Sequence, residues 1–94
     1  MYNILLYDVV DDYLARREPL RARHLELIRQ AHDRGELVMA GAFADPADGA
    51  ALLFTGNDRT AAERFAENDP YVKEGLVTRW RVRTWNVVVG GDAG

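Results

Sequence analysis

The chain has 94 residues and a formal net charge of -3, so it is long enough for one domain with one core and too short for a second catalytic domain. It contains no cysteine, which excludes disulfides, thiolate nucleophiles and cysteine-ligated metal clusters. The acidic balance argues against a nucleic-acid partner, which normally needs a basic surface, and the absence of serine excludes a Ser-His-Asp triad.

The first expected element is a strand over Tyr2 to Val10, which is dense in β-forming residues and largely apolar on both faces. Asn3 and Asp8 interrupt its apolar run and no basic segment precedes it, so the pattern is typical of neither a signal peptide nor a membrane span. We therefore expect a cytoplasmic protein without a membrane partner. Residues 11–18 follow as a polar connection that contains Tyr13.

A helix is expected from Pro19 to about Arg34, because proline suits the first turn of a helix and Gly35 suits the position after its end. At 3.6 residues per turn, its apolar stripe has His24 in the middle. The stripe consists of Leu20, His24, Leu27, Ile28 and Ala31. Arg17 stands just ahead of the helix, and Arg21 lies one turn before the histidine. A histidine that faces the core beside two cations needs a hydrogen-bond acceptor.

Two further strands are expected over residues 37–43 and 50–55, joined by a turn over residues 44–49 that is rich in aspartate, with proline and glycine. Thr60 and Glu63 have the spacing of a capping box at the start of a second helix. The expected buried stripe of that helix consists of Ala62, Phe65 and Ala66.

Pro70 ends the second helix, because the residue before a proline is biased away from the helical conformation. A last strand is expected over residues 76–89, where apolar residues alternate with three arginines. The arginines are Arg79, Arg81 and Arg83. They form either an anion-binding stripe or, as is commoner, a solvated strand face. Trp85 falls on the arginine side, followed by Val87 and Val89, and this switch of parity predicts either a bulge or a strand that changes neighbours.

The expected order is therefore β-α-β-β-α-β, the ferredoxin-like α+β arrangement on one antiparallel sheet. Two helices can cover only one face of the sheet, whereas the first three strands are apolar on both faces. We expect a homodimer that pairs two sheets through the open face; the alternative is a monomer with some exposed apolar side chains. The domain is expected over residues 1–89, with a flexible tail over residues 90–94.

Four motifs occur together along the chain. They are Arg17-x-x-x-Arg21-x-x-His24-Leu25, Gly41 at the end of the second strand, Asp69-Pro70-Tyr71-Val72, and Trp80-x-Val82-x-x-Trp85. In this combination the chain resembles the YCII-related (YciI-like) family over nearly its whole length. The resemblance implies a dimeric α+β barrel and a lyase activity on small ring compounds. The chain departs from the family at Gly41-Ala42, where Gly-Pro is common, and in its acidic Asp8, which lies about one residue from the family position.

The resemblance also implies that His24 and Asp69 form the active site. Asp69 would accept the hydrogen of one ring nitrogen and leave the other nitrogen to move a substrate proton, because imidazole exchanges protons near neutral pH. The alternative is a structural hydrogen bond between the two helices. Asp69 can also cap the turn that begins at Pro70, and its two oxygens allow both roles to coexist.

The candidate substrate-binding residues are Arg17, Arg21, Asp8 and Tyr71. A guanidinium offers a planar fork of donors to a carboxylate or phenolate, but an arginine here could instead neutralise Asp8 or Asp69. Tyr71 and Tyr7 suit the wall of a pocket for an aromatic ligand, although aromatic residues at such positions are more often core.

We expect no cofactor, because no glycine-rich phosphate loop is present, and no metal, because the only two histidines, His24 and His32, fall on different helix faces. Two functions remain. In the first, His24 is the general acid or base of an elimination or isomerisation on a small anionic or aromatic metabolite. In the second, the same pocket binds a ligand without turnover, as in a sensor or accessory protein.

Overall fold

Four antiparallel strands form one sheet in the computed structural model, which describes residues 1–56 and 58–91. The strands are β1 (Tyr2–Val9), β2 (Leu37–Ala42), β3 (Gly49–Thr55) and β4 (Val77–Trp85). Their order in the sheet is β2-β3-β1-β4, which confirms the ferredoxin-like α+β arrangement. Residues 92–94 of the expected tail lie outside the described residues.

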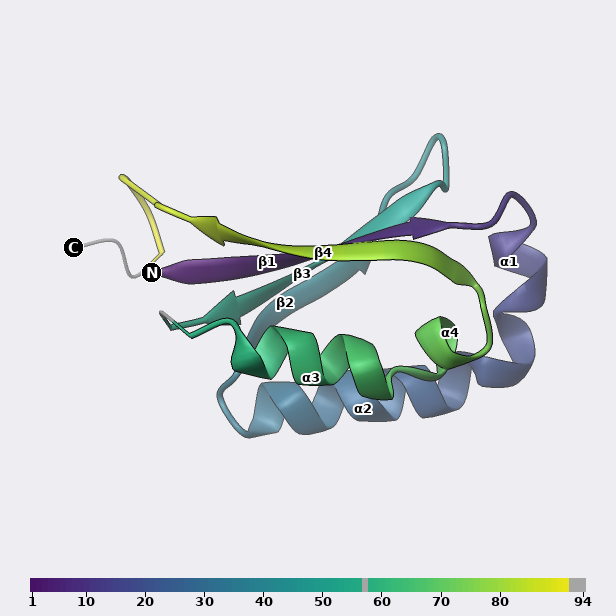
Figure 1. The fold of residues 1–94 in the computed structure, drawn as a ribbon, viewed down its shortest axis with the longest axis horizontal. Coiled ribbons are helices and arrows are strands. Elements are labelled where there is room, and N and C mark those ends of the chain that lie inside the picture. Colours follow the sequence, from purple (N-terminus) through teal and green to yellow (C-terminus); the bar gives the residue numbers. More distant parts are fainter. Residues whose placement is uncertain (57, 92–94) are drawn as a thin grey trace.

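The helices cover one face of the sheet, as Figure 1 shows. They are α1 (Tyr13–Arg16), the 3-10 helix η1 (Glu18–Leu20), α2 (Arg21–Asp33), α3 (Thr60–Asn68) and α4 (Pro70–Lys73). Both α2 and α3 run along the sheet, whereas α1 and η1 wrap around one end of it (Figure 1). The other face of the sheet carries no helix of the described chain (Figure 1).

Alternation along β1 assigns its residues to the two faces as the sequence predicts. Leu5 and Tyr7 are 0% and 2% exposed and belong to the core, whereas Asp8 is exposed on the opposite face. The core between sheet and helices also contains Leu52, Phe54, Ala62, Phe65, Ala66 and Val82. The predicted stripe of α3 is therefore confirmed.

The helix expected from Pro19 begins differently in the structure. Pro19 lies in η1, and the α-helix proper starts only at Arg21, without a side-chain cap at Leu20. The polar connection before it contains the short helix α1, whose Tyr13 is buried with 4% exposure. The sequence does not predict this helix, because a single helical turn is too short to give a periodic pattern of apolar residues. Because α1 ends at Arg16 and η1 begins at Glu18, Arg17 is the single residue that joins the two helices.

The start of α3 is capped by a residue other than the predicted one. Thr60 is the first residue of the helix, and the carboxylate of Asp58 accepts hydrogen bonds from its backbone nitrogen at 2.9 Å and its hydroxyl at 2.6 Å. These two bonds lower the pKa of Asp58. The predicted capping box of Thr60 and Glu63 is therefore wrong, because Asp58, two residues before Thr60, accepts from the backbone N–H and the hydroxyl of Thr60.

The last strand ends at Trp85, four residues before the predicted end. A bulge is present, but it lies near the start of the strand, where Asp8 pairs with Arg79 and Val9 with Val77. Thr78 is the additional residue of this bulge. From Arg79 to Trp85 the side chains then alternate regularly between the two faces of the sheet. Trp85 consequently shares the open face of the sheet with the three arginines.

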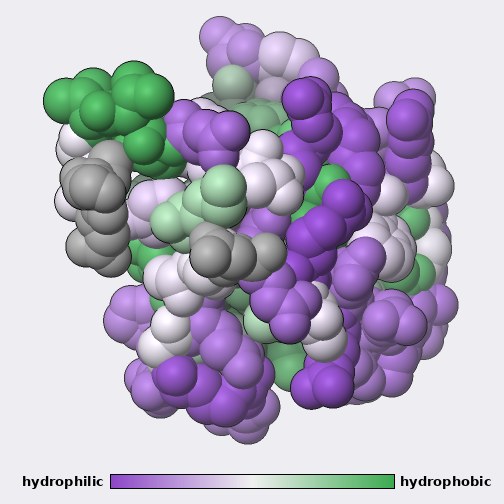
Figure 2. Space-filling model, turned by 60° about the vertical axis from the view of Figure 1, so that its left-hand side comes forward, coloured by the Kyte–Doolittle hydropathy of each residue, from purple (hydrophilic) through white to green (hydrophobic). Residues whose placement is uncertain are grey.

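Large apolar side chains remain exposed outside the core. On the open face of the sheet, Met39, Phe43 and Trp85 are 64%, 46% and 47% exposed. After β4, Val88 and Val89 are 91% and 83% exposed, and Figure 2 shows a hydrophobic cluster at one edge of an otherwise mainly hydrophilic surface. None of the helices in the described part of the chain has both the length and the apolar character that crossing a membrane requires.

Candidate functional site

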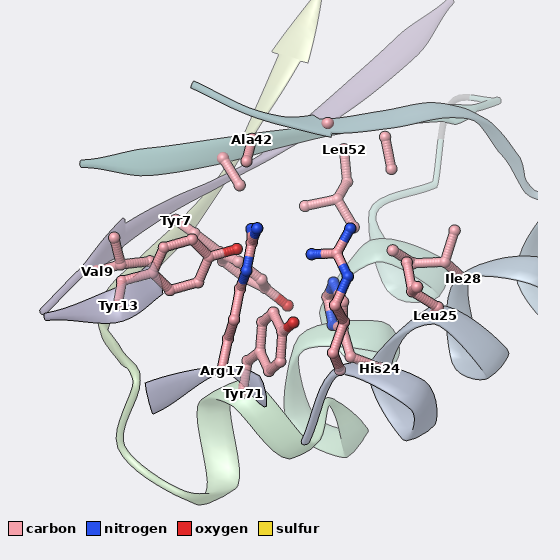
Figure 3. Close-up of a pocket in the computed structure, with 14 residues that line it drawn as sticks. Tyr7, Val9, Tyr13, Arg17, His24, Leu25, Ile28, Ala42, Leu52 and Tyr71 are labelled. Atoms are coloured by element: carbon pink, nitrogen blue, oxygen red, sulfur yellow. The ribbon is translucent and has the colours of Figure 1, made fainter. Parts of the chain in front are cut away.

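A cavity of about 180 Å³ lies between the helices and the sheet, with walls from β1, β2, β3, α1, α2 and α4 (Figure 3). Its polar side chains are Tyr7, Tyr13, Arg17, Arg21, His24 and Tyr71. The rest of its described lining consists of aliphatic residues and one glycine. The cavity therefore combines an apolar interior with a few convergent polar groups, the usual make-up of a small-molecule site.

The His24 side chain forms the centre of the polar wall. Its Nδ1 lies 2.8 Å from Oδ1 of Asp69, and the two residues are 9% and 0% exposed. The apolar stripe of α2 turns the imidazole inward, and Pro70 starts a new turn that brings the carboxylate to it. The predicted pair is therefore present and buried.

Three donors converge on the carboxylate of Asp69. Besides His24, the backbone nitrogen of Tyr71 donates to Oδ1 at 3.0 Å, and the hydroxyl of Tyr7 donates to Oδ2 at 2.7 Å. Asp69 thus caps α4 and holds the imidazole through the same oxygen, and both predicted roles coexist. A carboxylate with these donors requires the hydrogen of His24 on Nδ1, which leaves Nε2 free to accept a proton.

Aromatic rings hold the imidazole of His24 in place. The ring of Tyr71 stacks on it at 3.7 Å between centroids and 8° between planes, and the ring of Phe65 packs edge-on at 6.5 Å. Tyr13 in turn packs edge-on against Tyr71 at 5.8 Å. Stacking and the bond to Asp69 together leave the imidazole little rotational freedom, which is the pre-organisation that acid-base chemistry needs.

Both predicted arginines line this cavity. Neither Arg17 nor Arg21 has a carboxylate of the described chain within salt-bridge distance, since Asp8 pairs with Arg81 and Asp69 with His24. The alternative in which Arg21 neutralises one of these aspartates is therefore wrong. The guanidinium carbon of Arg17 lies 5.3 Å from the centre of the Tyr13 ring. The two arginines give the cavity a positive character.

Asp8, also a predicted substrate-binding residue, is not brought to this cavity. It is exposed on the open face of the sheet, where Oδ2 lies 3.8 Å from Nη1 of Arg81. Its chain neighbours Tyr7 and Val9 both line the cavity, and successive residues of a strand point to opposite faces. The alternation of β1 therefore separates Asp8 from the other site residues.

Two tyrosines of the cavity stay protonated at neutral pH. Burial, and next the charge of Asp69, raise the pKa of Tyr7 far above its usual range. Burial, followed by the effect of Tyr13, raises the pKa of Tyr71, against the smaller opposing influence of Arg21 and Arg17. Both hydroxyls consequently keep their hydrogen, which Tyr7 donates to Asp69 and which Tyr71 can donate to a ligand.

The raised pKa of Tyr7 predicts a loss of stability in alkali. In the unfolded chain its phenol ionises above the ordinary value of 10.0, whereas in the folded protein it keeps its proton. The stabilisation is complete below that value, and above it unfolding releases a proton. The free energy of unfolding should then fall by about 1.4 kcal/mol per pH unit for each such tyrosine.

Urea unfolding at several pH values above 10 measures this slope. The variant Tyr7→Phe should show a shallower slope than the wild type, because its phenol is gone in both states. An equal slope in the two proteins would mean that Tyr7 ionises normally when folded.

Tyr7, which the sequence suggests as a pocket-lining residue, does line the cavity, but its bond to Asp69 spans 62 positions and no local pattern predicts it. Tyr13 was not predicted as a site residue. Tyr13 lies in a segment with no periodic signal.

Within the described ranges, no group of three or more His, Asp or Glu side chains is arranged to hold a metal ion.

Comparisons with known proteins complete this description. The model of the YCII-related domain matches residues 1–86. Curated proteins named YciI from Escherichia coli O6:H1 and Shigella flexneri are each 32% identical over an alignment of 97 residues, which covers 94% of this chain and 98% of theirs. The fold is also similar to that of 5-chloro-2-hydroxyhydroquinone dehydrochlorinase from Burkholderia phenoliruptrix AC1100 in complex with 2,5-dihydroxybenzoquinone, with a TM-score of 0.73, 20% identity, and coverage of 90% of this chain and 93% of that one.

Proposed function

Because this chain belongs to the YCII-related family, we propose that its cavity binds a small metabolite and that His24, oriented by Asp69, transfers a proton to or from it. The observation that carries the proposal is the 2.8 Å contact between Nδ1 of His24 and Asp69, beside a cavity that His24 itself lines. This contact reserves one ring nitrogen for the carboxylate and leaves the other for a ligand.

The size and charge of the cavity indicate the class of ligand. A protein cavity of about 150 Å³ can hold one benzene molecule, so that about 180 Å³ suits a single-ring or similarly small compound. Arg17 and Arg21 favour a ligand with negative charge, and Tyr71 offers an aromatic wall. Small anionic or aromatic metabolites therefore fit this site best.

Elimination or isomerisation is the reaction class that we propose. Nε2 of His24 takes a proton from the ligand, and the electron pair that remains forms a new double bond. In an elimination the leaving group departs with its own electron pair; in an isomerisation the proton returns at another atom. The activity of the structural neighbour, a dehydrochlorinase, belongs to the first of these classes. The same cavity could instead serve a sensor or accessory protein that binds without turnover.

A thermal-shift screen of single-ring acids and phenols tests the proposal. It should begin with 2,5-dihydroxybenzoquinone as a binding probe and with 5-chloro-2-hydroxyhydroquinone, under nitrogen, as a probe of chloride release. Turnover of a bound compound that depends on His24 supports an enzyme. A ligand that binds in this cavity and is never converted favours the sensor or accessory function.

We further propose that two copies of the chain pair through the open sheet face. That face carries exposed Met39, Phe43 and Trp85 around a hollow of about 400 Å³, and exposed apolar patches on soluble proteins commonly mark association surfaces. A symmetric dimer would cover this face without touching the helices.

Sedimentation at micromolar concentration should give twice the chain mass of 10.6 kDa for the wild type and the chain mass for Phe43→Glu, because a two-fold interface buries the new charge twice. Glu67→Lys, on the exposed side of α3, should sediment as the wild type does. A monomeric wild type would contradict the proposed dimer.

A further inference from the structure

Two polar atoms in the wall of the cavity are buried without a hydrogen-bond partner anywhere in the described chain. They are Nε of Arg17 and the hydroxyl oxygen of Tyr71. Tyr71 is 2% exposed, and both residues line the cavity. An unpaired polar group in the interior lowers stability, and in a native protein it needs a reason.

Packing accounts for the ring of Tyr71 but not for its hydroxyl. The ring stacks on His24 and meets the edge of Tyr13, and the backbone nitrogen binds Asp69. A phenylalanine could make all of these contacts. The hydroxyl of Tyr7 differs from that of Tyr71 in having a partner, because it donates to Asp69 at 2.7 Å.

Figure 3 shows the hydroxyl of Tyr71 and the guanidinium of Arg17 directed into the same space, next to His24. The charged side chains that line the cavity in the described chain are Arg17 and Arg21, and no acidic side chain lies among the lining residues there. The one nearby carboxylate, Asp69, is 0% exposed and already accepts three hydrogen bonds. The unpaired donors therefore face a positively charged space that suits an anionic acceptor from outside the chain.

We propose that the hydroxyl of Tyr71 and Nε of Arg17 together bind an anionic oxygen of the ligand, either a phenolate or an enolate. The inference rests on the proposed function, because it assigns these donors to the oxygen that gains charge when Nε2 of His24 removes a proton. The electron pair left by that proton moves through the conjugated bonds onto the oxygen, and no bond to the protein forms. The ligand class is thus narrowed to small compounds whose acidic oxygen is conjugated with the bond that loses the proton.

The chemistry of the two donors agrees with this role. Burial raises the pKa of the Tyr71 phenol, so that it donates its hydrogen to an anion instead of becoming an anion itself. Fixed donors in a space that excludes water stabilise developing charge strongly, since they need no reorganisation during the reaction.

Binding of 4-nitrophenolate and of nitrobenzene tests the inference, because these probes share a ring and differ in the anionic oxygen. Calorimetric titration should show that the wild type binds 4-nitrophenolate more tightly. Tyr71→Phe should weaken its binding about tenfold and leave nitrobenzene unchanged, and Arg17→Lys, which keeps the charge but loses Nε, should act in the same direction.

Thermal unfolding gives a second, independent measurement with a matched control. Tyr71→Phe removes a hydroxyl without a partner and should melt at or above the wild-type temperature, whereas Tyr7→Phe breaks a buried bond and should melt below it. The inference is overturned if 4-nitrophenolate fails to bind, if the two probes bind equally, or if Tyr71→Phe lowers the melting temperature without changing their ratio. None of these measurements involves turnover. If the wild type binds 4-nitrophenolate as expected but no turnover depends on His24, the proposed function is contradicted, whereas the binding of an anionic oxygen by Tyr71 and Arg17 still holds.

Discussion

Replacing Asp69 with alanine should lower the free energy of unfolding by about 3–5 kcal/mol, the expected result of removing one partner from a buried charged network. The carboxylate accepts from His24, from the hydroxyl of Tyr7 and from the backbone nitrogen of Tyr71, and all three donors would stay buried without an acceptor. Such a loss is a large fraction of the total stability of a domain of this size, which is about 5–15 kcal/mol. It should lower the melting temperature by more than about 12 °C.

Asp8→Ala is the matched control for Asp69→Ala, because it removes a carboxylate whose only contact of this kind in the described chain is an exposed one, 3.8 Å from Arg81. Exposed ion pairs contribute about 0–1 kcal/mol, so this variant should unfold almost as the wild type does. Chemical denaturation of both variants measures the difference. Similar, small losses in the two would show that the bonds to Asp69 contribute little to the fold.

Replacing His24 with asparagine should reduce the turnover of a substrate about 10²- to 10⁴-fold, the usual contribution of a general acid or base. The amide of asparagine can take the place of Nδ1 and still donate to Asp69, but it has no group at the position of Nε2. Binding of the substrate should change little, since Arg17, Arg21 and Tyr71 are untouched. The loss should therefore appear in kcat and not in KM.

The exposed His32 provides the control for this experiment, and His32→Asn should keep wild-type turnover. Added imidazole should restore part of the activity of His24→Ala, because alanine, unlike asparagine, leaves room for a free ring against Asp69. If His24→Asn turns over substrate at the wild-type rate, the imidazole has no part in the chemistry and its bond to Asp69 serves the fold.

The order of elements and the places of His24 and Asp69 within them follow from local patterns. The 3.6-residue periodicity of residues 21–33 places His24 on the buried face of α2, and Pro70 fixes Asp69 as the residue that caps the next turn. Each of these signals lies within a few positions of the residue concerned. Periodicity and capping are short-range properties, so they can be interpreted before any tertiary contact is known.

The prediction was wrong at three local features, because competing sequence signals lie close together at each of them. These features are the cap of α3, the end of β4 and the position of the bulge in β4. Asp58 and Thr60 are both good caps, and the one that reaches the free N–H groups depends on the backbone path before the helix. The apolar valines after Trp85 continue the pattern of a strand although no partner strand pairs with them in the described sheet. Strand length is set by the partner as well as by the strand itself.

By itself the sequence determined the β-α-β-β-α-β order and an inward-facing His24, and its resemblance to the YCII-related family implied Asp69 as the acceptor. Only the tertiary structure decided that Tyr7, 62 positions from Asp69, completes the carboxylate's partners, and that Arg17 and Tyr71 present unpaired donors to one cavity. It also decided that Asp8 lies on the other side of the sheet. The physical reason is that strand pairing and helix docking bring together residues far apart in the chain, and no local pattern encodes which of them meet.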